Sequence, residues 1–338
     1  MITRRRAVIQ VIACSALLHA TQRAWPQATA TVRRIGLLVS GAEKSAATQQ
    51  GAAKFREALQ RAGWDEARNL AIEWRFAEGR DERLPALADE LVRANVEVIV
   101  ASSNAAIGAA IAATRRAARA LPIVMYAAWE PVEAGFIASF ARPGGNVTGT
   151  TAAPHELNGK VYELLKATVP AARRVAVLQD ASFVTALAGS YTKTARDAAS
   201  ALGIDLWPFA VRRPDEWPML FERIAANGAD ALMVEYGPLV RNHYADIASF
   251  AIKRKLPTIG PEAQFARAGG LLYYGPDAEE LLPRTVGYID RILRGARPAD
   301  LPVEMPTRYL TTINLRTARA IGHTIPQSVL LRADEVIE

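Results

Sequence analysis

The feature that most constrains this chain is that strand-like apolar runs alternate with segments of helix-like apolar spacing. This alternating series occurs twice along the chain. Short apolar runs bounded by turn residues predict buried strands, whereas the segments between them carry apolar residues at helical spacing. In the first half the predicted strands are 34–40, 70–76, 96–101 and 123–126, and the predicted helices are 48–62, 83–95 and 104–118. Strands that alternate with helices pair in parallel, so this half favours a parallel sheet covered by helices on both faces.

The second half repeats this plan. Three pairs of segments correspond in order and pattern: 33–40 with 173–180, 94–103 with 226–235, and 120–125 with 255–260. They are separated by roughly 135 residues, whereas solenoid units repeat every 20 to 50 residues. The repeating unit is therefore a whole small domain, and we predict an α/β protein of two similar Rossmann-like lobes with parallel sheets, joined by a hinge. Chance similarity between ordinary βα units is the alternative explanation.

The C-terminal part has no counterpart in the first half. Residues 277–294 predict an amphipathic helix, the prolines Pro298, Pro302 and Pro306 predict extended chain, and 329–332 predict a final strand. These additional elements are explained if the C-terminal segment crosses between the two lobes once more. We therefore assign 31–152 to the first lobe, completed by 276–297, and 153–275 to the second lobe, completed by part of 298–338.

Residues 1–30 have the pattern of a secretory signal peptide. A basic start at 1–6 precedes an apolar stretch at 7–20 that is too short to span a bilayer comfortably. Residues 28–30 (Ala-Thr-Ala) match the small-x-small site of signal peptidase. The Arg4-Arg5 pair also resembles a twin-arginine signal, which leaves general secretory and twin-arginine export both open. We expect a periplasmic protein whose mature chain starts near Thr31.

The single cysteine, Cys14, offers a different processing route. The order Val-Ile-Ala-Cys over 11–14 suits a lipobox, in which Cys14 is lipidated and anchors the protein to a membrane. The apolar run continues past it to Leu18, which favours cleavage near Ala30 instead. Either route leaves no cysteine for a disulfide in the folded part, and we expect membrane contact only through a lipid anchor or a membrane partner.

Composition and motifs argue against several functions. The formal net charge is +7, but the first 30 residues hold four arginines and no acid, so the charge argues little for nucleic-acid binding. No phosphate-binding loop or nucleophile elbow is present, and His155, His243 and His323 have no paired spacing. We therefore expect no catalytic residues, no metal, no cofactor and no nucleic-acid partner.

Candidate ligand residues follow the predicted strands, because open α/β sheets bind ligands beyond the carboxyl ends of their strands. Two such lobes that face one another form a cleft that can close on a small molecule. The candidates of the first lobe are Ser40, Ser102, Ser103, Asn104 and Trp129, and those of the second are Asp180, Glu235, Tyr236 and Tyr274.

The charged and polar candidates suit a zwitterion. Residues 102–104 open a predicted helix whose N-terminus favours a carboxylate, and Asp180 and Glu235 can hold an ammonium group. Simpler roles stay open: Ser102 or Ser103 as a helix cap, Asp180 as a cap of the next helix, and Glu235 as partner of an arginine.

The aromatic candidates offer flat apolar walls and faces for cation–π contacts. Trp129 and Tyr236 each follow a predicted strand, although Trp129 can equally pack at the hinge. Tyr273 and Tyr274 are adjacent, so they face opposite sides of a strand and only one can line the cleft. Together with the charged candidates they predict a zwitterionic ligand with an apolar or aromatic part.

Several motifs along the chain carry a family resemblance. They lie at 77–80 (Ala-Glu-Gly-Arg), 83–88, 121–125, 141–149, 269–275, 299–304, 306–307 and 330–337. With these motifs the chain resembles the ABC-transporter substrate-binding proteins of the type I periplasmic-binding-protein fold, in the group with tryptophan/tyrosine-uptake-like members. The resemblance spans about 33–338 and implies a monomeric solute receptor. Such a receptor closes on an amino acid or related carboxylate, which in this group includes aromatic ones, and delivers it to a membrane permease with its ATPase.

Two departures from the family pattern lie near the expected cleft. Trp129-Glu130-Pro131-Val132 stands where Gly-Asp-Pro-Val is usual, and Glu235-Tyr236 replaces a Pro-Asp-like pair. A large indole in place of glycine is expected to reshape the pocket. A ligand sensor of the same fold is an alternative, and so is a periplasmic enzyme that uses Asp180 or Glu235 as acid or base.

Overall fold

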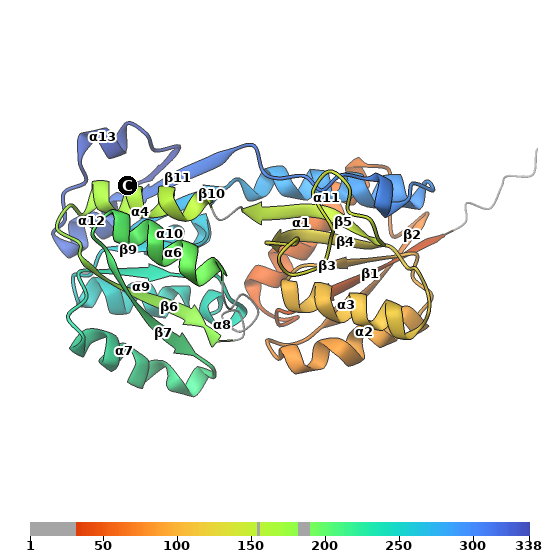
Figure 1. The fold of residues 1–338 in the computed structure, drawn as a ribbon, viewed down its shortest axis with the longest axis horizontal. Helices are drawn as coiled ribbons and strands as arrows, with labels where there is room; N and C mark the ends of the chain where they lie inside the picture. The colour runs from red at the N-terminus through yellow and green to blue at the C-terminus, as the bar shows by residue number, and fades with distance from the viewer. Residues whose placement is uncertain (1–31, 154–155, 182–189) are drawn as a thin grey trace, which may run out of the picture. The chain divides into compact units, whose positions relative to one another are not determined.

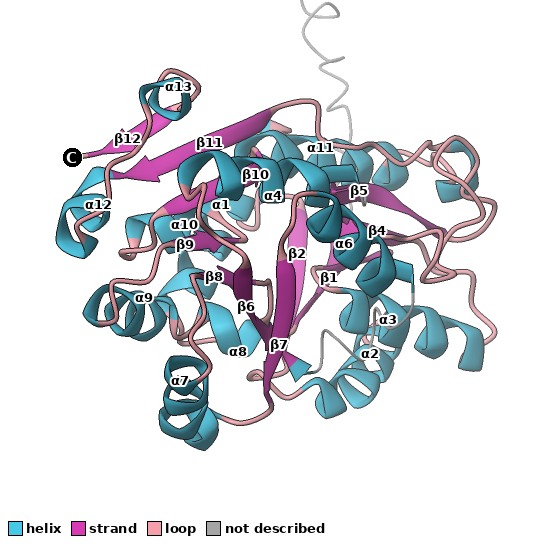
Figure 2. Ribbon diagram, turned by 60° about the vertical axis from the view of Figure 1, so that its left-hand side comes forward, coloured by secondary structure: helices cyan, strands magenta, loops and turns pink. Residues whose placement is uncertain are grey.

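The computed structural model describes residues 32–153, 156–181 and 190–338 of the chain. The expected signal segment with Cys14, and also His155, lie outside these residues. Within them the chain forms two sheets, each covered by helices on both faces (Figures 1 and 2). We call the five-stranded sheet with its helices the first lobe, and the seven-stranded sheet with its helices the second lobe.

The first lobe is a wholly parallel sheet in the order β2-β1-β3-β4-β5. Its strands are β1 (Arg33–Val39), β2 (Leu70–Phe76), β3 (Val98–Ala101), β4 (Ile123–Trp129) and β5 (Val147–Ala153). Its helices are α1 (Ala46–Arg61), η1 (Asp81–Arg83), α2 (Leu84–Arg93), α3 (Asn104–Arg116) and α11 (Ala278–Leu293), with the short η3 (Pro298–Asp300) beside β5. Helices α2 and α3 cover one face, and α1 and α11 cover the other.

The second lobe has the order β12-β11-β10-β9-β8-β6-β7, parallel except between β10 and β11. Its strands are β6 (Arg174–Asp180), β7 (Asp205–Val211), β8 (Ala231–Val234), β9 (Thr258–Gly260), β10 (Leu272–Pro276), β11 (Tyr309–Asn314) and β12 (Glu335–Ile337). Its helices are α4 (Glu156–Thr168), α6 (Ser190–Ala201), η2 (Pro214–Glu216), α7 (Trp217–Ala226), α8 (Pro238–Arg241), α9 (Tyr244–Lys253), α10 (Ala263–Arg267), α12 (Leu315–Ile321) and α13 (Gln327–Leu330).

The predicted fold class is confirmed, and the internal repeat reappears in the topology. The order β2-β1-β3-β4-β5 of the first sheet matches β7-β6-β8-β9-β10 of the second. Local sequence explains the elements: α2 buries Leu84, Leu87 and Leu91 on one stripe, and each central strand consists of buried aliphatic residues.

Two details differ from the sequence prediction. Strand β5 was not predicted, because its sequence Val-Thr-Gly-Thr-Thr-Ala-Ala has few large apolar residues. The final strand predicted at 329–332 is wrong: α13 ends there at Leu330, and the strand β12 follows at Glu335–Ile337. Pro326 precedes this helix, and Leu331 is 78% exposed, so the apolar run does not mark a buried strand.

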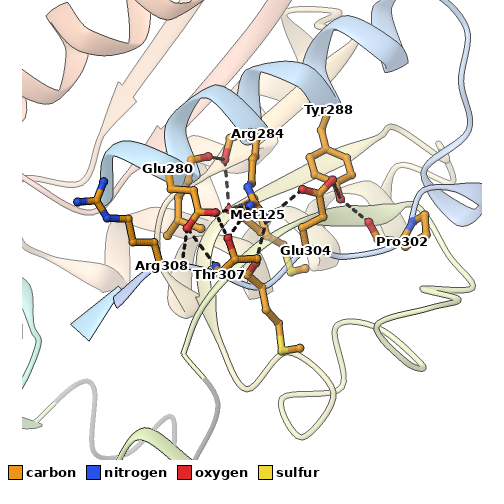
Figure 3. A network of polar contacts seen from close by, with 12 residues as sticks. Met125, Glu280, Arg284, Tyr288, Pro302, Glu304, Thr307 and Arg308 are labelled. Carbon is orange, nitrogen blue, oxygen red and sulfur yellow. Dashed lines mark hydrogen bonds and ion pairs between the residues drawn. The ribbon is translucent and has the colours of Figure 1, made fainter. Parts of the chain in front are cut away.

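A polar network ties the segment that leads back to β11 onto helix α11 (Figure 3). The carboxylate of Glu280 accepts hydrogen bonds from the backbone N–H groups of Thr307 and Arg308, both at 3.0 Å. The Thr307 hydroxyl and the guanidinium of Arg284 also donate to Glu280. This segment is therefore held to the first lobe up to the residue before β11.

The same segment is tied to strand β5. Glu304 exchanges backbone hydrogen bonds with Gly149 (3.1 Å) and Thr151 (3.0 Å), and its carboxylate accepts from the hydroxyl of Tyr288 at 3.1 Å. Figure 3 shows these side chains gathered along α11. Helix α11 in turn packs on β4 and β5, so 301–308 belongs physically to the first sheet.

The Glu280 contacts predict a pH dependence of stability. The Thr307 hydroxyl, the two N–H groups and Arg284 lower the pKa of Glu280 below its ordinary value of 4.5, against an opposing effect of burial. A lowered folded-state pKa means stability that is full above the unfolded-state pKa and lost as pH falls through the folded-state pKa. Glu280→Gln should therefore lower the melting temperature at pH 7. The difference in melting temperature between the variant and the native protein should become smaller as the pH falls from 5 to 3. An equal difference at all pH values, measured by circular dichroism, would contradict this.

Candidate functional site

Two hydroxyls meet at the carboxyl ends of β1 and β3. Ser40 directly follows β1 and is buried, and its Oγ lies 2.7 Å from the Oγ of Ser103 in a hydrogen bond. Ser103 is the N-cap of α3, where its Oγ accepts from the N–H of Ala106 at 3.1 Å. Ser102 precedes it and is half-buried. Ser103 thus caps α3 and also forms, with Ser40, a polar group at the edge of the sheet.

Asp81 adds a carboxylate to these hydroxyls. It begins the short helix η1 after β2 and hydrogen-bonds to Ser40, while its Oδ1 is buried without a hydrogen-bond partner among the described residues. Burial raises the pKa of Asp81, and the negative charge of Asp180 raises it further. Sequence reasoning missed Asp81 as a site residue, although it follows the 77–80 motif at the end of a predicted strand.

Asp180 brings a second carboxylate from the other lobe. It ends β6, is 2% exposed, and its Oδ2 accepts from the backbone N–H of Leu239 in α8 at 3.0 Å. Gly237 packs directly on it. Asp81 and Asp180 thus place two negative charges from two lobes within electrostatic reach of each other, an arrangement that a cation between them stabilises.

The close packing of Gly237 predicts a sensitive position. A Cβ added there would lie 2.2 Å from the Cβ of Asp180, so Asp180 or α8 must shift. We expect Gly237→Ala to destabilise the protein by about 1 to 3 kcal/mol and to weaken ligand binding. Gly159→Ala, where a new Cβ meets nothing within 4 Å, is the control and should leave both unchanged or slightly raise stability. Thermal melting of both variants checks this, and equal melting temperatures would refute it.

Glu235 and Tyr236 follow β8 and interact with different partners. Glu235 is buried and accepts a hydrogen bond from Nε2 of Gln179 at 2.7 Å. Its charge also raises the pKa of Tyr162 in α4, after the larger effect of burial. The pKa of Tyr236 is raised by burial first, while Arg241, which hydrogen-bonds it, opposes the rise. The charge of Asp180 also acts on Tyr236, so these two residues share one neighbourhood.

A cluster of tyrosines surrounds an ion pair beside Tyr236. Arg241 Nε lies 3.2 Å from Oε2 of Glu262, which also accepts from the hydroxyl of Tyr244 at 3.0 Å. Tyr126 in β4 of the first lobe is affected by the same groups. Burial raises its pKa to about 12, and the charge of Glu262 is the next largest cause of this rise. Arg241, Glu262, Tyr244 and Tyr126 were not predicted from sequence.

Asn104 has a defined task near Trp129. Its amide Nδ2 donates to the carbonyl of Trp129 at 2.7 Å, and its Oδ1 accepts from the N–H of Trp129 at 2.9 Å. Asn104 is buried, so its side chain holds the end of β4 against the start of α3. Trp129 itself is half-buried at this end. Asn104, predicted as a ligand residue, thus positions Trp129, predicted as an aromatic wall of the cleft.

Tyr274 is placed differently from the other predicted residues. Its ring stacks on Tyr309, with centroids 6.2 Å apart, and it packs against the core on the α4 side of the second sheet. Within 32–153, 156–181 and 190–338, no hydrogen bond or ring contact links it to the Asp180 and Tyr236 group. Its neighbour Tyr273 is buried, and the charge of Glu262 contributes to raising its pKa.

The described residues contain no group of three or more His, Cys, Asp and Glu side chains arranged to hold a metal ion. No helix in the described part of the chain combines the length and apolar character needed to cross a membrane.

The assembled site has one chemical character. Asp81 hydrogen-bonds to Ser40, which adjoins the N-cap of α3, and the charge of Asp180 from the second lobe acts on both Asp81 and Tyr236. Such a site can hold a small molecule with a positive group, an anionic group and a flat apolar part.

Comparison with known proteins agrees with the fold. A curated tyrosine-binding protein of Clostridioides difficile (strain R20291) is 26% identical over 267 residues, which cover 79% of this chain and 75% of the relative. A conserved domain protein of Vibrio cholerae superposes with a TM-score of 0.82 at 23% identity, covering 90% of this chain and all (100%) of that one. An ABC domain of Streptococcus pneumoniae in complex with L-Trp superposes with a TM-score of 0.81 at 24% identity, covering 91% and 100%.

The family profile described as ABC transporter substrate binding protein matches residues 38–337. Proteins of this family are normally periplasmic or extracellular, bind small ligands and work with an ABC permease and ATPase; they are binding proteins and not an enzyme family. With two α/β lobes and a family match over residues 38–337, this chain belongs to the family of ABC transporter substrate-binding proteins.

Proposed function

We propose that this chain binds an amino acid with an aromatic side chain between its two lobes and delivers it to a membrane permease. One observation carries the choice of ligand class. Asp81 keeps a buried carboxylate oxygen without a hydrogen-bond partner among the described residues, beside two serine hydroxyls and within reach of Asp180. A ligand ammonium group supplies the missing donor and neutralises both charges.

The carboxylate of the ligand fits beside this ammonium position. Ser103 is the N-cap of α3 and Ser40 is hydrogen-bonded to it, and at this helix end free backbone N–H groups and the helix dipole favour an anion. An α-amino acid carries its ammonium and carboxylate groups on the same carbon atom, so its head group matches hydroxyls and carboxylates that lie next to one another.

The aromatic part of the ligand is proposed from the neighbouring residues and from the relatives. Tyr126, Trp129 and Tyr236 offer aromatic surface from both lobes close to the head-group position. The curated relative is a tyrosine-binding protein, and the structure from Streptococcus pneumoniae contains L-Trp. Both agree with an aromatic side chain against these rings.

Export and delivery complete the proposal. Residues 1–30 serve as the signal peptide, with lipidation at Cys14 as the alternative, and the mature protein acts as a monomer. The lobes 31–152 with 276–297, and 153–275 with part of 298–338, close on the ligand. Ligand binding shifts an open–closed equilibrium, and the permease recognises the closed form.

Calorimetric titration of the mature chain tests this function. The chain from Thr31 is unfolded and refolded to remove ligand carried over from expression, and is then titrated with tyrosine, tryptophan, phenylalanine, leucine, glutamate and ribose. Binding of at least one aromatic amino acid, recovered chemically intact, is expected. A bound amino acid that returns altered would indicate an enzyme, and binding of ribose alone would refute the ligand class.

A further inference from the structure

The Arg241–Glu262 pair is more elaborate than a structural ion pair needs to be. Oε2 of Glu262 lies 3.2 Å from Arg241 Nε and accepts from the Tyr244 hydroxyl at 3.0 Å, while Arg241 Nη2 donates to Oε1 of Gln264 at 3.0 Å. The side chains of Arg241 and Glu262 are still 29% and 27% exposed. The carboxylate of Glu262, fixed by Arg241 and Tyr244, thus keeps part of its surface and hydrogen-bonding capacity available.

Helix α8 connects this pair to the head-group site. The backbone N–H of Leu239 in α8 donates to Oδ2 of Asp180 at 3.0 Å, and the last residue of the same helix, Arg241, pairs with Glu262 at 3.2 Å. Tyr236, two residues before α8, hydrogen-bonds Arg241, and the charges of Glu262 and Asp180 both act on it. A ligand side chain that follows α8 from Asp180 reaches Glu262.

We propose that Glu262, held in place by Arg241 and Tyr244, accepts a hydrogen bond from the far end of the ligand side chain. It thereby selects aromatic amino acids with a donor there, tyrosine or tryptophan, over phenylalanine. This inference rests on the proposed function, because it takes the head group to lie at Asp81 and Asp180. Glu262 is then the residue that determines specificity within the aromatic class.

This preference follows from the free-energy cost of covering an ion pair with a ring that cannot form a hydrogen bond to it. A phenylalanine ring that excludes water from Glu262 returns no hydrogen bond, whereas a phenol or indole donor replaces the lost water. Fully buried polar sites reject an analogue that lacks the donor by about 10,000-fold or more. The Glu262 pair is partly exposed, so we expect roughly 10- to 100-fold.

The experiment compares dissociation constants for tyrosine, tryptophan and phenylalanine by calorimetry. The native protein should bind tyrosine or tryptophan about 10- to 100-fold more tightly than phenylalanine. In Glu262→Gln this preference should fall below about 5-fold, because a neutral amide is a weaker acceptor than a carboxylate. Phenylalanine affinity should change little. Glu222→Gln, an exposed carboxylate on α7, is the matched control and should keep the native preference.

A second variant guards against a folding defect. Tyr244→Phe removes only the hydroxyl that holds Glu262, and should reduce the preference without loss of phenylalanine binding. An unchanged preference in Glu262→Gln, an equal loss for all three ligands, or a native protein that binds phenylalanine as tightly as tyrosine and tryptophan would each overturn the selection by Glu262. A native protein that binds no aromatic amino acid would instead refute the proposed function itself, so the two failures are distinct.

Discussion

Asp180→Asn is expected to weaken amino-acid binding by roughly 30- to 5,000-fold. Loss of one partner of a desolvated, hydrogen-bonded charge pair costs about 2 to 5 kcal/mol, and each 1.4 kcal/mol is tenfold in affinity. In the proposed complex the ligand ammonium lies between Asp180 and Asp81, so the variant leaves it with half of its counter-charge. Titration calorimetry with the amino acid found for the native protein measures the effect.

The substitution separates charge from structure. Asparagine keeps the size of Asp180 and an oxygen that can accept from the N–H of Leu239, so α8 should stay in place and the melting temperature should change little. Asp246→Asn, at an exposed position in the first turn of α9, is the matched control and should bind normally.

Ligand analogues sharpen this comparison. If Asp180 recognises the ammonium group, the variant should lose affinity for tyramine, which retains the ammonium without the carboxylate. Its affinity for 3-(4-hydroxyphenyl)propionate, which has only the carboxylate, should be unchanged or improved. Native-like binding of the amino acid by Asp180→Asn would exclude Asp180 from ammonium recognition.

Asn104→Ala is expected to lower the free energy of unfolding by about 2 to 4 kcal/mol. The amide of Asn104 satisfies both the N–H and the carbonyl of Trp129 at a buried position, and a polar group that loses its partner in such a place costs about 1 to 3 kcal/mol. Two such groups lose the Asn104 partner at once. Denaturant unfolding, followed by fluorescence or circular dichroism, measures the change.

The result separates a positioning role of Asn104 from a purely ligand-binding one. Asn227→Ala removes a half-buried asparagine whose side chain makes no hydrogen bond within the described residues, and should change stability by less than about 0.5 kcal/mol. If Asn104→Ala keeps native stability and only loses ligand affinity, then Asn104 is a direct ligand contact and its bonds to Trp129 contribute little.

Sequence reasoning succeeded where the signal is local. Strand β2 coincides with the predicted 70–76, and Ser103 caps α3 as a serine before an alanine-rich helix should. Ser40 and Ser103 were predicted as residues that follow strands, and they meet because β1 and β3 are neighbouring parallel strands whose carboxyl ends lie at one edge.

It failed where a residue acquires its role from a distant partner. Asp81 begins the short helix η1 after an edge strand, and nothing in its own segment marks its buried oxygen or the nearby charge of Asp180. Arg241 ends α8 and Glu262 is the N-cap of α10, 21 residues later, so no spacing rule joins them. The role of Tyr274 as a wall of the cleft stays a prediction; its ring stacks on Tyr309, which reaches it because β11 pairs antiparallel with β10.

Hydrophobic periodicity and its duplication along the chain were sufficient to determine the two-lobed α/β architecture. Burial acts on each segment through its own pattern of apolar residues, so that information is local and survives in a single sequence. The tertiary structure alone decided which polar groups complement one another. The hydrogen bonds and charges of the site join residues that are distant in the chain, such as Ser40 with Ser103 and Tyr126 with Glu262. Their energies depend on distances and burial that exist only after both lobes have folded.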